Sequence, residues 1–148
     1  MELAAQGCRV LCIDLDVGLR NLDIALGMAQ VPALSFPDVS EGGASLLEAA
    51  RHPGCEALSF LTAPVGRRPE ELDQEAFARM MEAVRKTFDI CLLDAPAGVG
   101  DGFRMAAQAA SLEGKVVAMI GDGGSRLSCR RVNSGGILPQ NSARAELC

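Results

Sequence analysis

Short apolar runs alternate along the chain with longer segments in which apolar residues recur at helical spacing. Four of the runs predict β-strands: Val10–Ile13, Ala57–Thr62, Ile90–Leu93 and Lys115–Ile120. The first and third have the pattern of strands buried on both faces, which is typical of parallel sheets. The alternation of strands and helices therefore predicts an α/β fold, a mostly parallel sheet with helices on both faces.

Helical periodicity is clearest from Asp73 to Phe88, where five large apolar residues share one face. Asp73 is suited to cap the start of this helix. Shorter helices are predicted at residues 45–51, where Ser45 and Glu48 match a capping box, and at residues 102–110. The first six residues have the pattern of a helix end that Gly7 terminates, so we expect the N-terminus to be a cut end.

Acidic side chains directly follow two of the predicted strands. Asp14 and Asp16 come after the first, with Gly18 close behind, and Asp94 comes after the third. Ligands of open parallel sheets bind at this carboxyl edge. In an extended chain Asp14 and Asp16 point the same way, roughly 6–7 Å apart, and such a pair favours a nearby cation. Mg²⁺, which takes one or two carboxylates together with phosphate oxygens, suits them.

Composition and charge exclude several classes of protein. The 148 residues are 49% hydrophobic, so the chain can form a core, and its net charge of −5 with only two lysines argues against a nucleic-acid groove. No apolar run approaches a membrane span and no signal peptide is present, so we expect a cytoplasmic protein. The six cysteines form no CxxC pair, and Cys12 and Cys91 fall inside predicted core strands.

Two motifs together resemble a known family. The stretch GLRNLDIALG after the Asp14–Asp16 pair, and DICLLDAPAG around Asp94, are similar to the MinD branch of the MinD/ParA family of deviant Walker-type P-loop ATPases. The likeness runs from about Glu2 to Ile120. It implies ATP and Mg²⁺ as cofactors, a homodimer, and division-regulator partners at the inner face of the cell membrane. In that family the activity is ATP hydrolysis in spatial regulation of the division septum.

The resemblance also implies a role for each matching residue. Asp16 would be catalytic and position the attacking water, and Asp94 would hold Mg²⁺ as the Walker B residue. Asp14 would lie near the outer shell of the metal. Pro96 and Gly98 would belong to the nucleotide-binding switch segment, with Gly98 contacting the γ-phosphate.

The chain departs from the family pattern at both ends. The phosphate-binding motif G-x-x-x-x-G-K-[ST] does not occur in it, and its only Gly-Lys pair, Gly114-Lys115, lacks the earlier glycine. We therefore expect an internal fragment that does not hydrolyse ATP alone. Residues 1–120 are predicted to form a partial ATPase domain. Residues 121–148, rich in glycine and serine, are predicted to be an unrelated tail that is disordered or non-native, with no recognisable membrane-binding helix.

Two alternatives from other classes remain open. One is a receiver-type phosphoacceptor domain, with Asp14 and Asp16 as the acidic pair, Asp94 as the phosphorylated residue and Lys115 as the later lysine. The separation of Asp16 from Asp94 is longer than one βαβ unit needs, which disfavours it. The other is a non-catalytic interaction module that keeps the family fold without the nucleotide.

Overall fold

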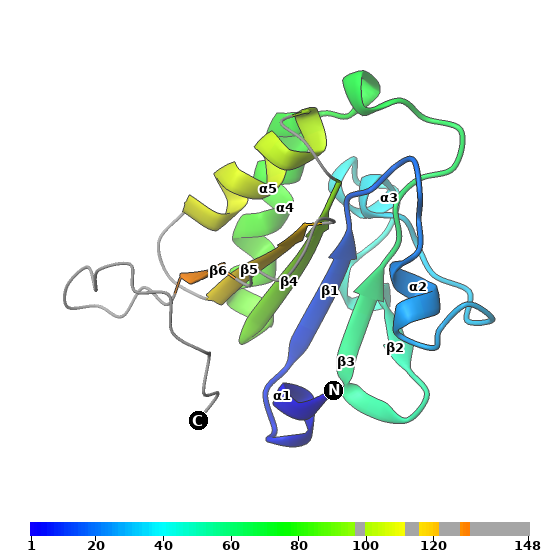
Figure 1. Cartoon of the computed structure of the whole chain (residues 1–148), viewed down its shortest axis with the longest axis vertical. Helices are drawn as coiled ribbons and strands as arrows, with labels where there is room; N and C mark the ends of the chain where they lie inside the picture. Colours follow the sequence, from blue (N-terminus) through cyan, green and yellow to red (C-terminus); the bar gives the residue numbers. More distant parts are fainter. Residues whose placement is uncertain (97–99, 112–115, 122–127, 131–148) are drawn as a thin grey trace.

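The computed structural model describes residues 1–96, 100–111, 116–121 and 128–130. Within these residues, six strands form one mixed sheet in the order β2–β3–β1–β4–β5–β6 (Figure 1). Their bounds are β1 Val10–Asp14, β2 Ala50–His52, β3 Cys55–Leu61, β4 Ile90–Ala95, β5 Val116–Gly121 and β6 Ser128–Arg130. The four inner strands run parallel, and β2 and β6 pair antiparallel at the two edges. The four parallel strands are those predicted from the apolar runs.

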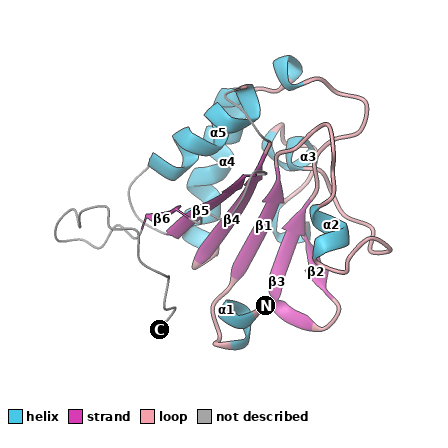
Figure 2. Cartoon of the chain, viewed as in Figure 1, coloured by secondary structure: helices cyan, strands magenta, loops and turns pink. Residues whose placement is uncertain are grey.

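Helices cover both faces of the sheet, as predicted (Figure 2). They are α1 Glu2–Ala5, α2 Leu22–Ala25, α3 Phe36–Ser40, α4 Gln74–Thr87 and α5 Asp101–Ser111, with single 3₁₀ turns η1 Leu46–Glu48 and η2 Pro69–Glu71. The larger core cluster packs α3, α4 and α5 against one face, and a smaller cluster lies under α1 and α2 on the other. As the helical pattern predicts, the Asp73 carboxylate caps α4 by accepting from the Ala76 N–H at 2.9 Å. None of the described helices has the length and apolar composition needed to cross a membrane.

The two central strands differ in how completely they are buried. Every residue of β1 is buried, as its sequence predicts. In β4 the burial alternates: Cys91, Leu93 and Ala95 are buried beneath α4 and α5, whereas Ile90 and Leu92 are only half-buried. The prediction that this strand is buried on both faces was therefore wrong. The reason is that α1 and α2 have only four residues each and cover less of the sheet than the long helices opposite.

An ion pair at the amino end of the sheet aligns these two strands. The Arg9 guanidinium donates to both carboxylate oxygens of Asp89, at 2.8 and 3.0 Å, and the Arg9 backbone N–H donates to the same carboxylate at 2.9 Å. Asp89 returns a backbone hydrogen bond to the Arg9 carbonyl. At the other end, the Leu15 N–H donates to the carbonyl of Asp94 at 2.8 Å. The register of β1 against β4 is thus fixed at both ends.

The helix predicted at residues 45–51 was wrong. Its capping box is present, because Ser45 accepts from the Leu47 N–H and Glu48 accepts from the Ser45 N–H. The helix nevertheless ends after one 3₁₀ turn, and the chain continues as β2, which pairs with β3. Pairing with β3, the next strand along the chain, has overridden the helical signal.

Part of the predicted tail lies within the described residues. β6 pairs antiparallel with β5, with Ala118 opposite Cys129. Residues 122–127 and 131–148 lie outside the described residues. The division into residues 1–120 and an unrelated tail therefore stays a prediction.

Candidate functional site

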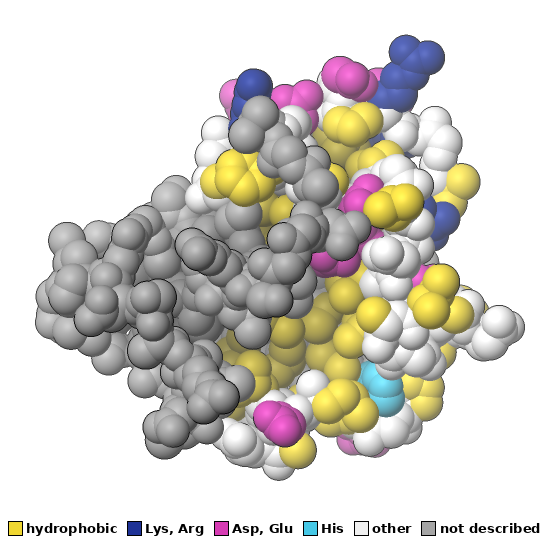
Figure 3. All heavy atoms as spheres, viewed as in Figure 1, with side chains coloured by type: hydrophobic (Ala, Val, Ile, Leu, Met, Phe, Trp, Pro, Cys, Tyr) yellow, Lys and Arg dark blue, Asp and Glu magenta, His cyan; other side chains and the backbone are white. Residues whose placement is uncertain are grey.

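Two of the predicted acidic residues lie opposite each other on neighbouring strands at the carboxyl edge of the sheet. Asp14 lies opposite Asp94 in the last residue pair that joins β1 to β4. Adjacent strands lie about 4.8 Å apart, and residues at even steps share a face, so Asp14 and Asp94 follow Cys12 and Leu92 on the side of α1 and α2. Figure 3 shows acidic side chains above a hydrophobic area on this face. The sequence prediction that these two positions meet at one edge is confirmed.

Asp14 is a fully buried carboxylate held by the backbone of the loop that follows it. Its Oδ1 accepts from the Asp16 N–H at 2.9 Å and its Oδ2 accepts from the Leu22 N–H at 3.3 Å. Burial raises the pKa of Asp14 above its ordinary value, although the two backbone hydrogen bonds and the charge of Arg20 act in the opposite direction. This carboxylate therefore ties the start of α2 to the end of β1.

Asp16 does not continue the extended strand. β1 ends at Asp14, and the Asp16 carboxylate turns forward, where its Oδ1 accepts from the backbone N–H groups of Gly18 and Leu19, both at 3.0 Å. The expected geometry, two carboxylates pointing the same way along one strand, was therefore wrong. The physical reason is that each short acidic side chain satisfies the backbone of the next turn. The catalytic role of Asp16 stays a prediction.

The segment after β4 lies against the start of α5. Pro96 follows the strand directly and α5 begins at Asp101, while residues 97–99, with the predicted Gly98, lie outside the described residues. Gly102 is buried at this junction, where an added Cβ would lie 2.8 Å from Pro96 Cγ and 3.2 Å from the Leu15 carbonyl oxygen. Gly102 thus allows the first turn of α5 to approach the ends of both β1 and β4.

Replacing Gly102 by alanine should lower the free energy of unfolding by about 1 kcal/mol. Alanine favours a helix by up to about 1 kcal/mol over glycine, but crowding in a packed site costs about 1–3 kcal/mol, and a proline ring and a backbone carbonyl cannot easily move aside. Urea unfolding of the two proteins measures the difference. Gly100→Ala is the matched control, because a Cβ there has no atom of the described residues within 4 Å. Equal stability changes for both variants would contradict the close approach at Gly102.

The described residues contain no cluster of three or more His, Cys, Asp or Glu side chains that could enclose a metal ion. A protein-enclosed cation site is therefore not found in that part of the chain. A nucleotide-bound Mg²⁺ has a different requirement, since it keeps several waters and takes only one or two carboxylates beside the phosphates. One carboxylate at this edge, that of Asp94, is enough for this smaller requirement, whereas both oxygens of the buried Asp14 already accept backbone N–H groups.

Sequence reasoning missed one charged residue near this edge. Arg20 adopts a left-handed backbone conformation with φ of +46°, and its Nη2 donates to the hydroxyl of Thr62 at 3.2 Å. Thr62 lies 42 positions further along the chain, so local patterns could not reveal the contact. The signal in the sequence that could have identified Arg20 is that it is the single arginine in a loop whose other charged residues are carboxylates.

Comparison with known proteins gives a consistent result. The septum site-determining protein MinD of Helicobacter pylori is 38% identical over 105 residues, which cover 70% of this chain and 39% of that protein. The MinD of Escherichia coli K12 is 33% identical over 106 residues, with 70% and 39% covered. The chain is a relative of MinD. The structure of MinD complexed with Mg-ADP from Pyrococcus horikoshii superposes with a TM-score of 0.58 and 26% identity, over 72% of this chain and 44% of that chain.

The relationship establishes the fold of the matched region. The chain has the MinD fold there, and the predicted resemblance to the MinD branch is confirmed. No protein-family model matches the chain. The chain spans about two fifths of the length of the curated MinD relatives that it matches, 39% in both cases above. We therefore treat the activity, substrates and partners of whole MinD proteins only as proposals for this chain.

Proposed function

We propose that this chain is the part of a MinD-type ATPase that carries the acidic edge, and that this edge holds Mg²⁺ of a bound adenine nucleotide. The supporting observation is the register of β1 and β4, which brings Asp14 and Asp94 level at the carboxyl edge of a MinD-like sheet. Ligands of open α/β sheets bind at this edge. The MinD structure from Pyrococcus horikoshii is described as a complex with Mg-ADP, which supports the same class of ligand.

Each residue of the edge has a proposed role. Asp94 holds the hydrated cation, and Asp16 orients the attacking water. Asp14 acts as a positioning residue, because its buried carboxylate holds the backbone of Asp16 in place. Pro96 and Gly98 direct the segment before α5 towards the phosphates. The Mg²⁺ ion would supply neutralisation of phosphate charge, which with positioning provides most of the catalysis in such sites.

The chain alone should bind nucleotide weakly. In P-loop ATPases the backbone and lysine of the phosphate-binding loop provide most contacts to the phosphates, and that motif does not occur in these 148 residues. Carboxylates alone repel a triphosphate unless the cation lies between them. We therefore propose that the chain binds Mg-ATP without hydrolysing it at a measurable rate.

Calorimetric titration with Mg-ATP, combined with a phosphate-release assay, tests this proposal. We expect binding in the millimolar range that requires Mg²⁺ and is lost in Asp94→Asn, with no phosphate release. Glu75→Gln is the matched control, because it removes one carboxylate from the exposed surface of α4, where the Glu75 side chain is 93% exposed. Mg²⁺-dependent turnover that Asp16→Ala abolishes would contradict the proposed inactivity. Absence of any Mg²⁺-dependent binding would contradict the nucleotide site and favour a non-catalytic interaction module.

Assembly and location are proposed from the same resemblance. We propose that the longer MinD protein to which such a segment corresponds forms a homodimer, binds division-regulator partners and acts at the inner face of the membrane. No observation favours the receiver-type alternative: Lys115 lies outside the described residues, and the buried oxygens of Asp14 already accept two backbone hydrogen bonds. Phosphorylation of Asp94 by a small phosphodonor remains its direct test.

A further inference from the structure

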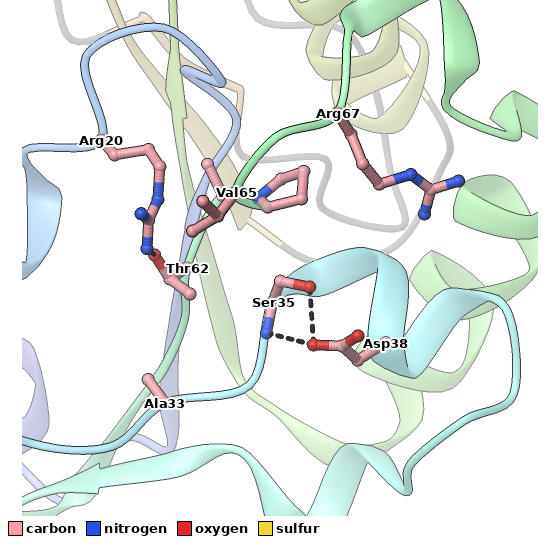
Figure 4. Close-up of a pocket in the computed structure, with 9 residues that line it drawn as sticks. Arg20, Ala33, Ser35, Asp38, Thr62, Val65 and Arg67 are labelled. Atoms are coloured by element: carbon pink, nitrogen blue, oxygen red, sulfur yellow. Dashed lines mark hydrogen bonds between the residues drawn. The ribbon is translucent and has the colours of Figure 1, made fainter.

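A cavity of about 310 Å³ lies beyond the carboxyl end of β3 and is lined by none of the residues of the acidic edge (Figure 4). The polar side chains that line it are Arg20, Ser35, Thr62 and Arg67, together with Asp38 in the first turn of α3. The first four come from the loop before α2, the segment entering α3 and the loop after β3. Its volume lies at the lower end of the range of small-molecule sites.

Backbone hydrogen bonds hold one wall of the cavity in place. The Thr62 N–H donates to the Leu34 carbonyl at 3.0 Å, and the Phe36 N–H donates to the Thr62 carbonyl at 2.9 Å. These two bonds form a parallel bridge between the segments that precede α3 and follow β3. Ser35 donates from its backbone N–H and its hydroxyl to one oxygen of Asp38, at 2.9 and 2.7 Å (Figure 4). The cavity is therefore formed without a ligand.

Arg20 leaves hydrogen-bond donors unused in this cavity. Its guanidinium has five N–H donors, of which one bonds Thr62, and its Nε is buried without a partner in the described structure. Asp14 acts on Arg20 through charge, but the oxygens of that carboxylate accept backbone N–H groups instead. The Nε–H is closed off from solvent, so a ligand in the cavity would meet the remaining N–H groups of Nη1 and Nη2.

The second arginine of the cavity is already paired. Arg67 donates to the Glu41 carboxylate at 2.7 Å and to the Glu71 carbonyl at 3.2 Å, and in Figure 4 its guanidinium points away from Arg20. Apolar side chains of Ala33, Ala63, Pro64 and Val65 also line the cavity, and Val65 is 76% exposed. The cavity thus combines one incompletely bonded guanidinium, the Asp38 carboxylate that already accepts two hydrogen bonds from Ser35, and an apolar surface.

From this combination we propose that the cavity binds a small organic anion. A carboxylate or phosphate-monoester group would accept hydrogen bonds from Arg20, since guanidinium recognises such planar or tetrahedral oxygen groups in pairs. A short apolar body would lie against Pro64 and Val65. None of the residues of the acidic edge lines the cavity, although Arg20 acts on the nearby Asp14 through charge. The anion proposal uses no contact of the nucleotide proposal.

Titration of the full chain with benzoate and with phenyl phosphate, followed by methyl NMR, tests this site. We expect saturable binding of at least one anion, with shifts at the methyl groups of Val65, Ala33 and Ala63. The more strongly bound anion identifies the oxygen group, and the neutral analogue benzamide should bind at least about tenfold more weakly. No saturable binding of either anion would overturn the proposal, as would shifts confined to residues outside the cavity.

Substitutions of Arg20 test whether anion binding depends on its guanidinium group or only on the positive charge of the protein. Arg20→Gln should weaken binding about tenfold or more, and Arg20→Lys should weaken it less, since it keeps the charge and loses the paired geometry. Arg79→Gln is the matched control: it makes the same charge change on the exposed side of α4 and should leave binding unaltered. Methyl spectra of the unliganded variants confirm folding. Equal binding by folded Arg20→Gln would overturn the site, and inorganic phosphate binding as tightly as phenyl phosphate would overturn the assigned apolar contact.

Discussion

Replacing Asp14 by alanine should lower the free energy of unfolding by about 2 kcal/mol. The change removes a charged acceptor from the N–H groups of Asp16 and Leu22, at about 1.5–3 kcal/mol for each such bond. Part of this loss is offset, because a buried carboxylate is itself unfavourable, as its raised pKa indicates. Denaturant unfolding at neutral pH measures the net change. A variant as stable as the unaltered chain would show that the two hydrogen bonds contribute no net stability.

The pH dependence of stability isolates the buried charge. A carboxylate whose pKa is higher in the folded chain binds more protons there than in the unfolded chain, so stability falls as pH rises from the ordinary value of 3.8 through the raised value. Above the raised value this contribution is constant. Asp14→Asn keeps an acceptor oxygen but does not titrate. The difference in stability between the two proteins should therefore shift in favour of Asp14→Asn across that interval, and a pH-independent difference would contradict the raised pKa.

Replacing Phe36 by alanine should have the largest effect, a loss of about 3–5 kcal/mol. Phe36 is 1% exposed at the start of α3 and meets Phe77 of α4 edge to face, with ring centroids 5.6 Å apart. Truncation removes both the buried area and this contact between two helices. Typical domains are stable by only about 5–15 kcal/mol, so thermal unfolding should show a large decrease in midpoint.

Two controls make the Phe36 measurement specific. Phe36→Leu keeps most of the volume and should cost less than Phe36→Ala, since volume-conserving changes are better tolerated. Leu47→Ala removes apolar atoms from a side chain that is 73% exposed and should change stability by no more than about 0.5 kcal/mol. Similar losses for Phe36→Ala and Leu47→Ala would contradict the described core.

The parallel strands could be predicted because their signal is local and strong. β1 and β4 are continuous apolar runs that end at an aspartate, and in each case the strand of the structure begins at the predicted residue. The helix from Asp73 was equally clear, because its apolar face and its cap agree. Where the pattern, the cap and the end signal point to one structure, sequence alone is sufficient.

Other features depend on contacts made outside the segment that carries the local signal. β2 forms because β3 pairs with it, although Ser45 and Glu48 carry a helix-start signal. Asp14 and Asp16 were correctly placed at the sheet edge, but their side chains bond neighbouring backbone instead of facing one ligand together. The cavity at Arg20 is assembled from three separate segments. Such sites become visible only when the chain is folded.

The bidentate pair of Arg9 and Asp89 has an evolutionary consequence for the opposite end of the sheet. The same number of residues separates Arg9 from Asp14 as separates Asp89 from Asp94. Asp14 and Asp94 therefore lie opposite each other only if both strands keep the same length. Deleting one residue from either strand would reverse its inward and outward positions and offset one aspartate from the other. Length changes in homologous chains should therefore accumulate in the connecting loops, and a tolerated change inside one strand should be matched by a change in its neighbour.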